Sequence, residues 1–319
     1  FVVGKLASCA AVALAVGSHA WPGHERLVAV AAVVALTGVN YLGVHRSARL
    51  TRAIVVVVLT VLVLVVVVAS TGDGRDVGRL AVGRDLTVGG VLQAAGLLFF
   101  AFAGYARIAT LGAEVREPRV TIPRAISISL GTTLVVYAAV ALAVLSVLGP
   151  DGLAASTVPL ADAVTRSGHP GLAPVVQAGA AIAALGSLLA LILGVSRTAF
   201  AMAADHHLPS ALAAVHPRYG VPHRAEVAVG LVVVAAVLTT DLRGAIGFSS
   251  FGVLVYYAIA NASAWTLDAS EDRPPRLVPV VGLAGCLVLA FSLPLASVLA
   301  GTAVLLVGVG SYVVRLRGS

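Results

Sequence analysis

The sequence predicts an all-α membrane protein, and three observations lead to this fold class. First, 59% of the 319 residues are hydrophobic and 11% are charged, whereas about a quarter of the residues in soluble proteins are charged. Second, the mean hydropathy is +1.02. Third, the apolar residues form ten runs separated by glycine, proline or charged residues. A helix of about 20 residues crosses the hydrocarbon of a bilayer and satisfies its own backbone polar groups there, so ten transmembrane helices are predicted.

The ten predicted spans follow the apolar runs in chain order. They are residues 2–20, 27–44, 53–70, 90–112, 125–149, 173–196, 225–240, 245–266, 277–293 and 296–314. The last two come from one apolar stretch, Leu277 to Val314, which is too long for a single crossing at about 1.5 Å per residue. Pro294 is the predicted divider, because proline cannot continue a helix without losing a hydrogen bond.

The basic residues predict the orientation in the membrane. The formal charge is +7 and the pI is about 10.0, but the charges are scattered through short segments, so no nucleic acid partner is predicted. Thirteen arginines lie in one alternating set of connecting segments and six in the opposite set. Cytoplasmic loops retain positive charge during insertion. The bias therefore predicts a multi-pass protein of the cell (plasma) membrane with both ends of this chain in the cytoplasm.

Cysteines and histidines give no sign of a metal or cofactor site. Cys9 and Cys286 lie inside apolar runs, where a thiol behaves as a small hydrophobe. Four histidines follow the sixth span, and their spacing matches no metal-ligand motif, so a solvated loop is the preferred interpretation over a metal site. They are His206, His207, His216 and His223. No cofactor and no metal are predicted.

The fourth span is interrupted by glycine and followed by a charge. Gly104 lies amid aromatic residues, and Arg107 comes directly after them. An arginine at membrane depth costs about 3 kcal/mol or more, so Arg107 should face water or a partner. Alternatively, it lies near the cytoplasmic end or pairs with Glu114, and Gly104 serves close helix packing. Discontinuous helices at the midplane bind substrate in many transporters, which makes the segment from Phe100 to Tyr105 the best candidate site.

Two long stretches resemble a transporter superfamily. The first is FFAFAGYARIATLGAEVREPRVTIPRAI, Phe99 to Ile126, and it resembles the sixth helix and following loop of the amino acid, polyamine and organocation superfamily. The second is RTAFAMAADHHLPSALAAVHPRYGVPHRA, Arg197 to Ala225, which is similar to the loop after that family's eighth helix. A weaker match, Asn40 to Val44 followed by Ser47-Ala48-Arg49, resembles the link between its fourth and fifth helices.

The resemblance implies a transporter fold of twelve helices, in which helices one to five and six to ten form a LeuT-type inverted repeat. The first span here resembles helix three, and the chain opens inside an apolar run without an initiator methionine. The expectation is therefore a single transmembrane domain, residues 1–319, truncated at its N-terminus and unable to bind substrate by itself. Within it, residues 1–70 would be a remnant of the first repeat, 90–266 the second repeat, and 277–314 two extra helices.

The resemblance also implies a substrate site. In the family, carbonyl groups of the unwound sixth helix hold the amino group of the substrate. The corresponding carbonyls here belong to Phe100, Ala101 and Ala103, with Gly104 permitting the break. Phe100 and Phe102 would be aromatic walls or gates, and Tyr105 completes the segment.

Three further charged residues are candidates for gating or coupling. Arg107 lies near the end of the fourth span, and Glu114 opens the loop after it. That loop is interpreted either as a solvated connector or as a cytoplasmic gate of ion pairs. Ala113 departs from the family pattern, which weakens the case for a shared carboxylate pair. Lys5 lies within the first span. If it lies deep in the membrane, it would contribute to coupling or specificity; otherwise it is a lysine at the membrane–water interface. Glu226 opens the seventh span and is most simply a helix N-terminal acid.

These observations together predict a secondary transporter and not an enzyme. The sequence has no nucleophile elbow, no phosphate-binding glycine loop with its lysine, and no metal-binding histidine pair. The predicted function is a permease that moves amino acids or related amines by alternating access. Its partners would be the substrate, the lipid bilayer and a coupled ion such as the proton, or an exchanged solute. The alternative is a membrane-embedded sensor or an inactive scaffold.

Overall fold

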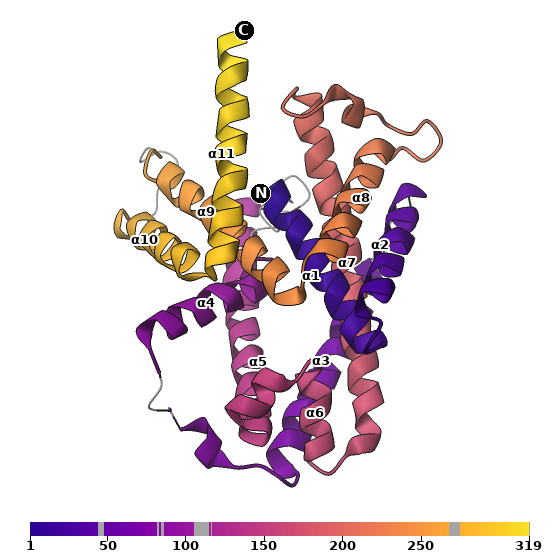
Figure 1. Ribbon diagram of the computed structural model, residues 1–319, viewed down its shortest axis with the longest axis vertical. Coiled ribbons are helices and arrows are strands. Elements are labelled where there is room, and N and C mark those ends of the chain that lie inside the picture. Colours follow the sequence, from indigo (N-terminus) through magenta and orange to yellow (C-terminus); the bar gives the residue numbers. More distant parts are fainter. Residues whose placement is uncertain are drawn as a thin grey trace. The chain divides into compact units, whose positions relative to one another are not determined.

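The computed structural model describes residues 1–43, 48–81, 83, 86–104, 115, 117–267 and 275–318, and these residues fold into helices joined by short segments (Figure 1). The α-helices are α1 (Val2–Ala20), α2 (Glu25–Tyr41), α3 (Ala48–Thr71), α4 (Val88–Phe102), α5 (Pro118–Ala155), α6 (Pro159–Arg166), α7 (Ala173–Ala204), α8 (His223–Thr239), α9 (Leu242–Ala264), α10 (Leu277–Ser292) and α11 (Leu295–Gly318). Short 3₁₀ helices are η1 (Val77–Leu80), η3 (Pro170–Leu172) and η4 (Ser210–Ala213). No strand occurs among the described residues.

Each of the ten predicted runs overlaps an α-helix, with residues 105–112 of the fourth run outside the described residues, so the helical class is confirmed. In the described part of the chain, five helices are long and apolar enough to cross a membrane, and the bent pair α10 and α11 would raise this number to six. Helices α2, α4 and α8 have 17, 15 and 17 residues and are shorter than a full crossing. The structure therefore supports a multi-pass membrane protein, while the ten-span arrangement stays a prediction. Helix α6 was not predicted.

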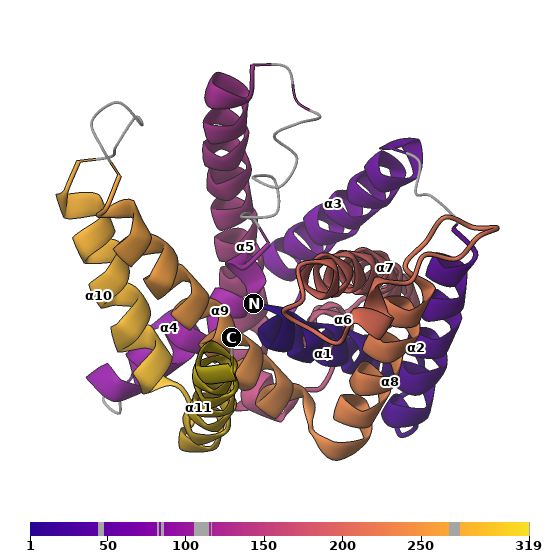
Figure 2. The same cartoon turned by 90° about the horizontal axis from the view of Figure 1, so that it is seen from above.

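One compact unit of the chain consists of Phe1–Ala11, Asp85–Ala103 and Leu238–Ser319. Within it, α9 packs against α4, α10 and α11, and α9 and α10 run side by side in both views (Figures 1 and 2). Its core is formed by Phe251, Leu254, Ala290 and Leu293. The chain turns at Pro294, where α10 and α11 meet at an angle of 117°, and the carbonyl of Pro294 accepts the Ser297 amide at 2.8 Å.

The second unit consists of Val12–Arg84 and Gly104–Val237. Helix α3 contacts α5, α6 and α7, and α2 contacts α7. The core lies where these helices meet, and its buried residues include Val65, Val144, Val147, Val164 and Val176. Helix α5 is interrupted at Gly149, whose φ of 71° lies in the left-handed region that glycine adopts without strain. This interruption lets residues 150–155 turn toward α6.

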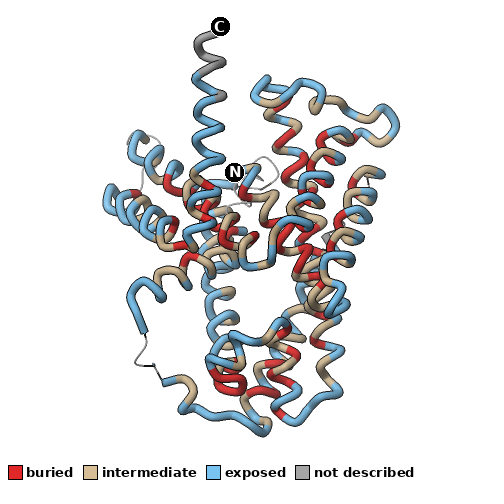
Figure 3. The backbone as a smooth tube through the Cα atoms, viewed as in Figure 1, coloured by how far each residue is buried: buried red, intermediate tan, exposed pale blue. Residues whose placement is uncertain are grey.

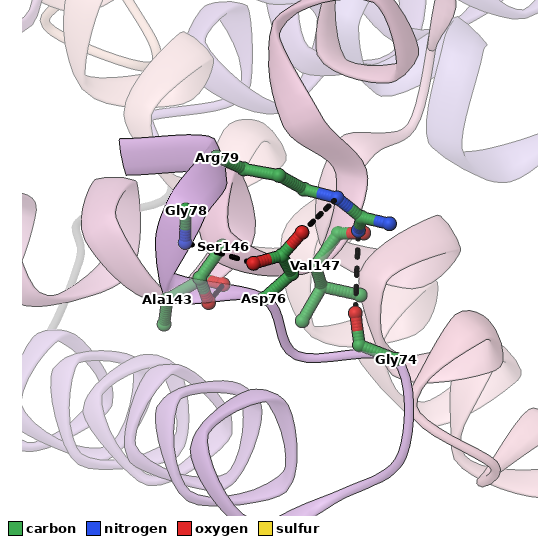
Figure 4. A network of polar contacts seen from close by, with 7 residues as sticks. All are labelled: Gly74, Asp76, Gly78, Arg79, Ala143, Ser146 and Val147. Atoms are coloured by element: carbon green, nitrogen blue, oxygen red, sulfur yellow. Dashed lines mark hydrogen bonds and ion pairs between the residues drawn. The ribbon is translucent and has the colours of Figure 1, made fainter. Parts of the chain in front are cut away.

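A polar network fastens the segment after α3 to the end of α5 (Figure 4). The amide of Asp76 donates to the Ser146 carbonyl at 2.9 Å, and the Asp76 carboxylate accepts from the Gly78 amide at 2.8 Å. Arg79 approaches that carboxylate at 3.7 Å and donates to the carbonyls of Gly74 and Val147. Because Arg79 reaches backbone carbonyls of both segments, it holds the linker in a defined position.

Many residues along the helices are exposed (Figure 3), and large apolar residues are among them. Val56, Val135 and Val307 are 62%, 69% and 73% exposed. Exposure of apolar surface to water costs about 25 cal/mol per Å², and contiguous faces of this kind mark membrane contact. The exposed faces are therefore explained by contact with lipid.

Candidate functional site

Helix α4 ends inside the apolar run in which the sequence predicted an interruption. The helix begins after Thr87, whose hydroxyl accepts the Gly90 amide at 3.1 Å, and it ends at Phe102. Ala103 closes the last turn with φ −66° and ψ 1°, and its amide donates to the Phe100 carbonyl at 3.3 Å. The last carbonyls of a helix have no partner within it and carry partial negative charge. The end of α4 is thus suited to a positively charged group.

Lys5 of α1 supplies such a group. Its Nζ donates to the carbonyl of Ala103 at 3.1 Å, across 98 residues of sequence. Ala103 is 6% exposed, and Lys5 is half-buried. A cation at a helix C-terminus in a partly buried setting is stabilised by up to about 2 kcal/mol. The structure therefore brings together two residues that the sequence singled out separately.

Helix α9 explains why Lys5 reaches this position. Gly4, next to Lys5, lies so close to Gly252 of α9 that a Cβ atom on Gly252 would come within 3.1 Å of the Gly4 Cα atom. The hydroxyls of Ser8 and Ser249 form a buried hydrogen bond of 2.6 Å one turn further along. Small residues at both positions permit this close helix contact. Since α9 also packs against α4, it is the common support of the lysine and the helix end.

The other predicted site residues have different surroundings. Phe100 and Phe102 are half-buried, and Ala101 and Gly104 are exposed. Phe99 forms an edge contact with Tyr257 of α9, with ring centroids 5.8 Å apart. Tyr105, Arg107 and Glu114 lie outside the described residues. Substrate binding by the segment from Phe100 to Tyr105 therefore stays a prediction. Gating or coupling by Lys5, Arg107 and Glu114 stays a prediction too.

A second polar site lies at the start of α8 and was not anticipated. Glu226 belongs to the first turn of that helix, as the sequence predicted, but its side chain is fully buried. The Ser196 hydroxyl of α7 lies 2.7 Å from its Oε1 atom in a hydrogen bond, and the side chains of Asn40 and Arg197 lie close to the carboxyl group. Nothing in the local sequence signals this burial, because Ser196 and Asn40 are far away along the chain.

A small cavity of about 80 Å³ adjoins these residues. Its lining comes from the end of α2, from α7 and from the segment before α8, and consists of Asn40, Gly43, Leu193, Arg197, Gly220, Val221 and Pro222. Arg197 and Gly220 are exposed, so the cavity reaches the surface of this unit. It holds a few water molecules at most.

The four loop histidines divide into two pairs. His206 and His207 are exposed, whereas His216 packs edge-on against His223 and Tyr41, with ring centroids 5.3 Å and 5.5 Å apart. The Nδ1 atom of His216 accepts the amides of Arg218 and Tyr219. Among the described residues, no group of histidine, cysteine, aspartate or glutamate has the arrangement of a metal site.

Comparisons with known proteins point to one family. The sequence profile of the family described as amino acid permease matches residues 2–312. An uncharacterized transporter of Mycobacterium tuberculosis (strain H37Rv) is 66% identical over 315 residues, which cover 99% of this chain and 72% of the relative. The branched-chain amino acid permease BcaP of Bacillus subtilis is 24% identical over 299 residues, 91% of this chain and 64% of the relative. Human cationic amino acid transporter 4 is 33% identical over 186 residues, 58% of this chain and 29% of the relative.

Proposed function

The chain belongs to the amino acid permease family, and we propose that it works as a secondary active transporter that moves amino acids or related amines across the cell membrane by alternating access. A transporter role, and not an enzymatic one, follows from the family and from the names of the relatives. The substrate class and the transport mechanism are proposals. Energy would come from an ion gradient, with the proton as one candidate, or from exchange.

The observation that carries the proposal is the Lys5 ammonium at the carbonyl end of α4. An amino acid zwitterion brings two opposite charges into a medium of low dielectric constant, so it needs fixed dipoles of both signs at close range. The carbonyls of Phe100, Ala101 and Ala103 supply negative dipoles, and Lys5 supplies a positive charge beside them. Phe100 and Phe102 would contact the side chain of the substrate.

The relatives restrict the substrate class without choosing one substrate. One is named for cationic amino acids and another for branched-chain amino acids. A fixed ammonium at the site favours neutral substrates over cationic ones, because like charges repel strongly at short range in a partly buried site. We therefore place neutral amino acids first among the proposed substrates.

Uptake of labelled amino acids by cells that express the gene tests the proposal. Uptake above that of cells with an empty vector is expected, and Phe102→Ala should lower kcat/KM about tenfold, because an aromatic contact with the substrate is worth about 1 kcal/mol or more. Leu98→Ala on the same helix is the matched control, since Leu98 is 65% exposed and lies one turn before Phe102. Equal uptake by Phe102→Ala, Leu98→Ala and the unaltered protein would remove this segment from the binding site.

A further inference from the structure

A strip of polar residues runs between α2 and α8. Thr37 and Asn40 lie one turn apart on α2, and His223 and Glu226 lie one turn apart on α8. The two helices approach closely here, because a Cβ atom added to Gly230 of α8 would lie 2.7 Å from the Thr37 hydroxyl. Such a strip is costly in an apolar bundle unless its polar atoms have partners.

Three polar atoms of this strip are buried without a hydrogen-bond partner among the described residues. They are Thr37 Oγ1, His223 Nδ1 and Glu226 Oε2. Glu226 is the residue with the greatest consequence, because it is completely buried and ionisable. A carboxylate ion at that depth, hydrogen-bonded to Ser196 and close to the Asn40 amide and the Arg197 guanidinium, would still lose much of its solvation energy.

The hydrogen bonds of Ser196 indicate where a proton resides. The Ser196 oxygen lies 3.1 Å from the Leu193 carbonyl and 2.7 Å from Glu226 Oε1, but a hydroxyl has one hydrogen and cannot donate to both. If Ser196 donates to the Leu193 carbonyl, its oxygen can accept from Glu226. A protonated Glu226 carboxyl group therefore satisfies both contacts, whereas an ionised one leaves one of them without a hydrogen.

Among the described residues, few charged groups lie around Glu226. Helix α7 contributes Arg197, which is exposed and lines the cavity. Helix α2 contributes the uncharged Asn40 amide. The start of α8 contributes His223 and Arg224, and Arg224 is exposed and donates to the Ala211 carbonyl at 3.4 Å. Asn40 and Arg197 lie close to the carboxyl group and also line the cavity, and this makes the cavity the route that we assign to protons between Glu226 and the solution.

We propose that Glu226 is a proton-binding site of this protein, separate from the end of α4. In the conformation described here, the carboxyl group is neutral and hydrogen-bonded to Ser196. On release, its O–H bond breaks, the proton passes to water in the cavity, and the carboxylate that remains is compensated by the Arg197 guanidinium. This inference concerns a carboxyl group of the chain itself and does not depend on which solute is transported.

Infrared difference spectroscopy of the purified protein tests the proposal. At neutral pH, the unaltered protein should show the C=O stretching band of a protonated carboxylic acid, and the band should shift in D₂O because the proton exchanges through the cavity. Glu226→Gln should abolish the band. Glu25→Gln should retain it, since Glu25 lies in the first turn of α2 but is half-buried and accepts the Gly23 amide, a hydrogen bond that lowers its pKa. A spectrum of Glu226→Gln identical to that of the unaltered protein would overturn the proposal.

A second variant covers the case in which Glu226→Gln does not fold. Ser196→Ala removes one hydrogen-bond partner from the carboxyl group and should move the acid band to higher frequency, while an unmoved band contradicts the assignment.

A sodium ion is the competing ligand for a lone buried carboxylate. If the acid band is absent and sodium raises the unfolding temperature of the unaltered protein but potassium does not, the site binds a metal cation and the proton assignment is wrong.

Discussion

At the scale of single residues, two side chains decide the charge inside the helices. Lys5 places an ammonium at the carbonyl end of α4, and Glu226 places a carboxyl group against Ser196. Both are partly or fully buried, so neither interaction is screened as strongly as a surface ion pair. Lys5 and Glu226 belong to different compact units of the chain.

Replacing Lys5 tests its effect on substrate charge. Lys5→Met keeps an unbranched chain and removes the ammonium, and we expect relative uptake of cationic over neutral amino acids to rise about tenfold or more. A like charge at about 8 Å and an effective dielectric constant of about 20 is worth about 2 kcal/mol, which sets this magnitude. Competition between labelled lysine and labelled leucine measures the ratio.

Lys5→Arg is the control for this experiment because it retains the positive charge. Its uptake ratio should stay close to that of the unaltered protein. If Lys5→Met and Lys5→Arg change the ratio equally, packing around residue 5 and not its charge controls the selection.

At the scale of secondary-structure elements, the turn between α1 and α2 depends on close backbone contact. A Cβ atom on Gly17 would overlap the backbone of Glu25, the first residue of α2. The turn also contains Gly23, which has a φ of 90° and donates its amide to Glu25 Oε1 at 2.7 Å. This hydrogen bond lowers the pKa of Glu25 below its ordinary value. The two helices are thus joined by a turn that tolerates little added volume.

Gly17→Ala should destabilise the protein by about 1–3 kcal/mol, because the added methyl group displaces backbone and not a flexible side chain. The midpoint of thermal unfolding in detergent measures the loss. Gly38→Ala on α2 is the control, since a Cβ atom there meets nothing within 4 Å, and alanine is the better helix former. A midpoint for Gly17→Ala equal to that of Gly38→Ala would show that α2 shifts without cost.

At the scale of the whole molecule, orientation in the membrane follows from charge and not from packing. The arginine bias predicts that the segment between α7 and α8 faces the cytoplasm and that the segment after α3 faces the opposite side. Arg218 and Arg75 are exposed residues of these two segments. Their side chains are therefore suited to report the side of the membrane on which each segment lies.

Single cysteines at these positions test the orientation. In a background with Cys9→Ala and Cys286→Ala, Arg75→Cys should react with a membrane-impermeant maleimide in intact cells, and Arg218→Cys should react after permeabilisation alone. Equal labelling after permeabilisation confirms that both thiols are accessible. Labelling of Arg218→Cys in intact cells would reverse the proposed orientation.

Much of the fold was predictable because helix formation in apolar runs depends on local sequence. The break at Pro294 was predicted for the same reason, since proline removes a backbone donor wherever it stands. The end of α4 within its apolar run was expected from the motif around Phe102, with the following residues 105–114 outside the described part of the chain. Helix α6 was missed, because its eight residues form an amphipathic segment too short for a hydropathy signal.

The amino-acid sequence by itself determined that this protein is an all-helical, multi-pass membrane protein of the amino acid permease family, because hydropathy, proline positions and family motifs are properties of adjacent residues. Tertiary structure alone decided that Lys5 meets the Ala103 carbonyl and that Ser196 meets Glu226. The physical reason is that these partners lie 98 and 30 residues apart. The Lys5 contact also depends on close helix packing at Gly4 and Gly252, whose effect appears when the helices have come together.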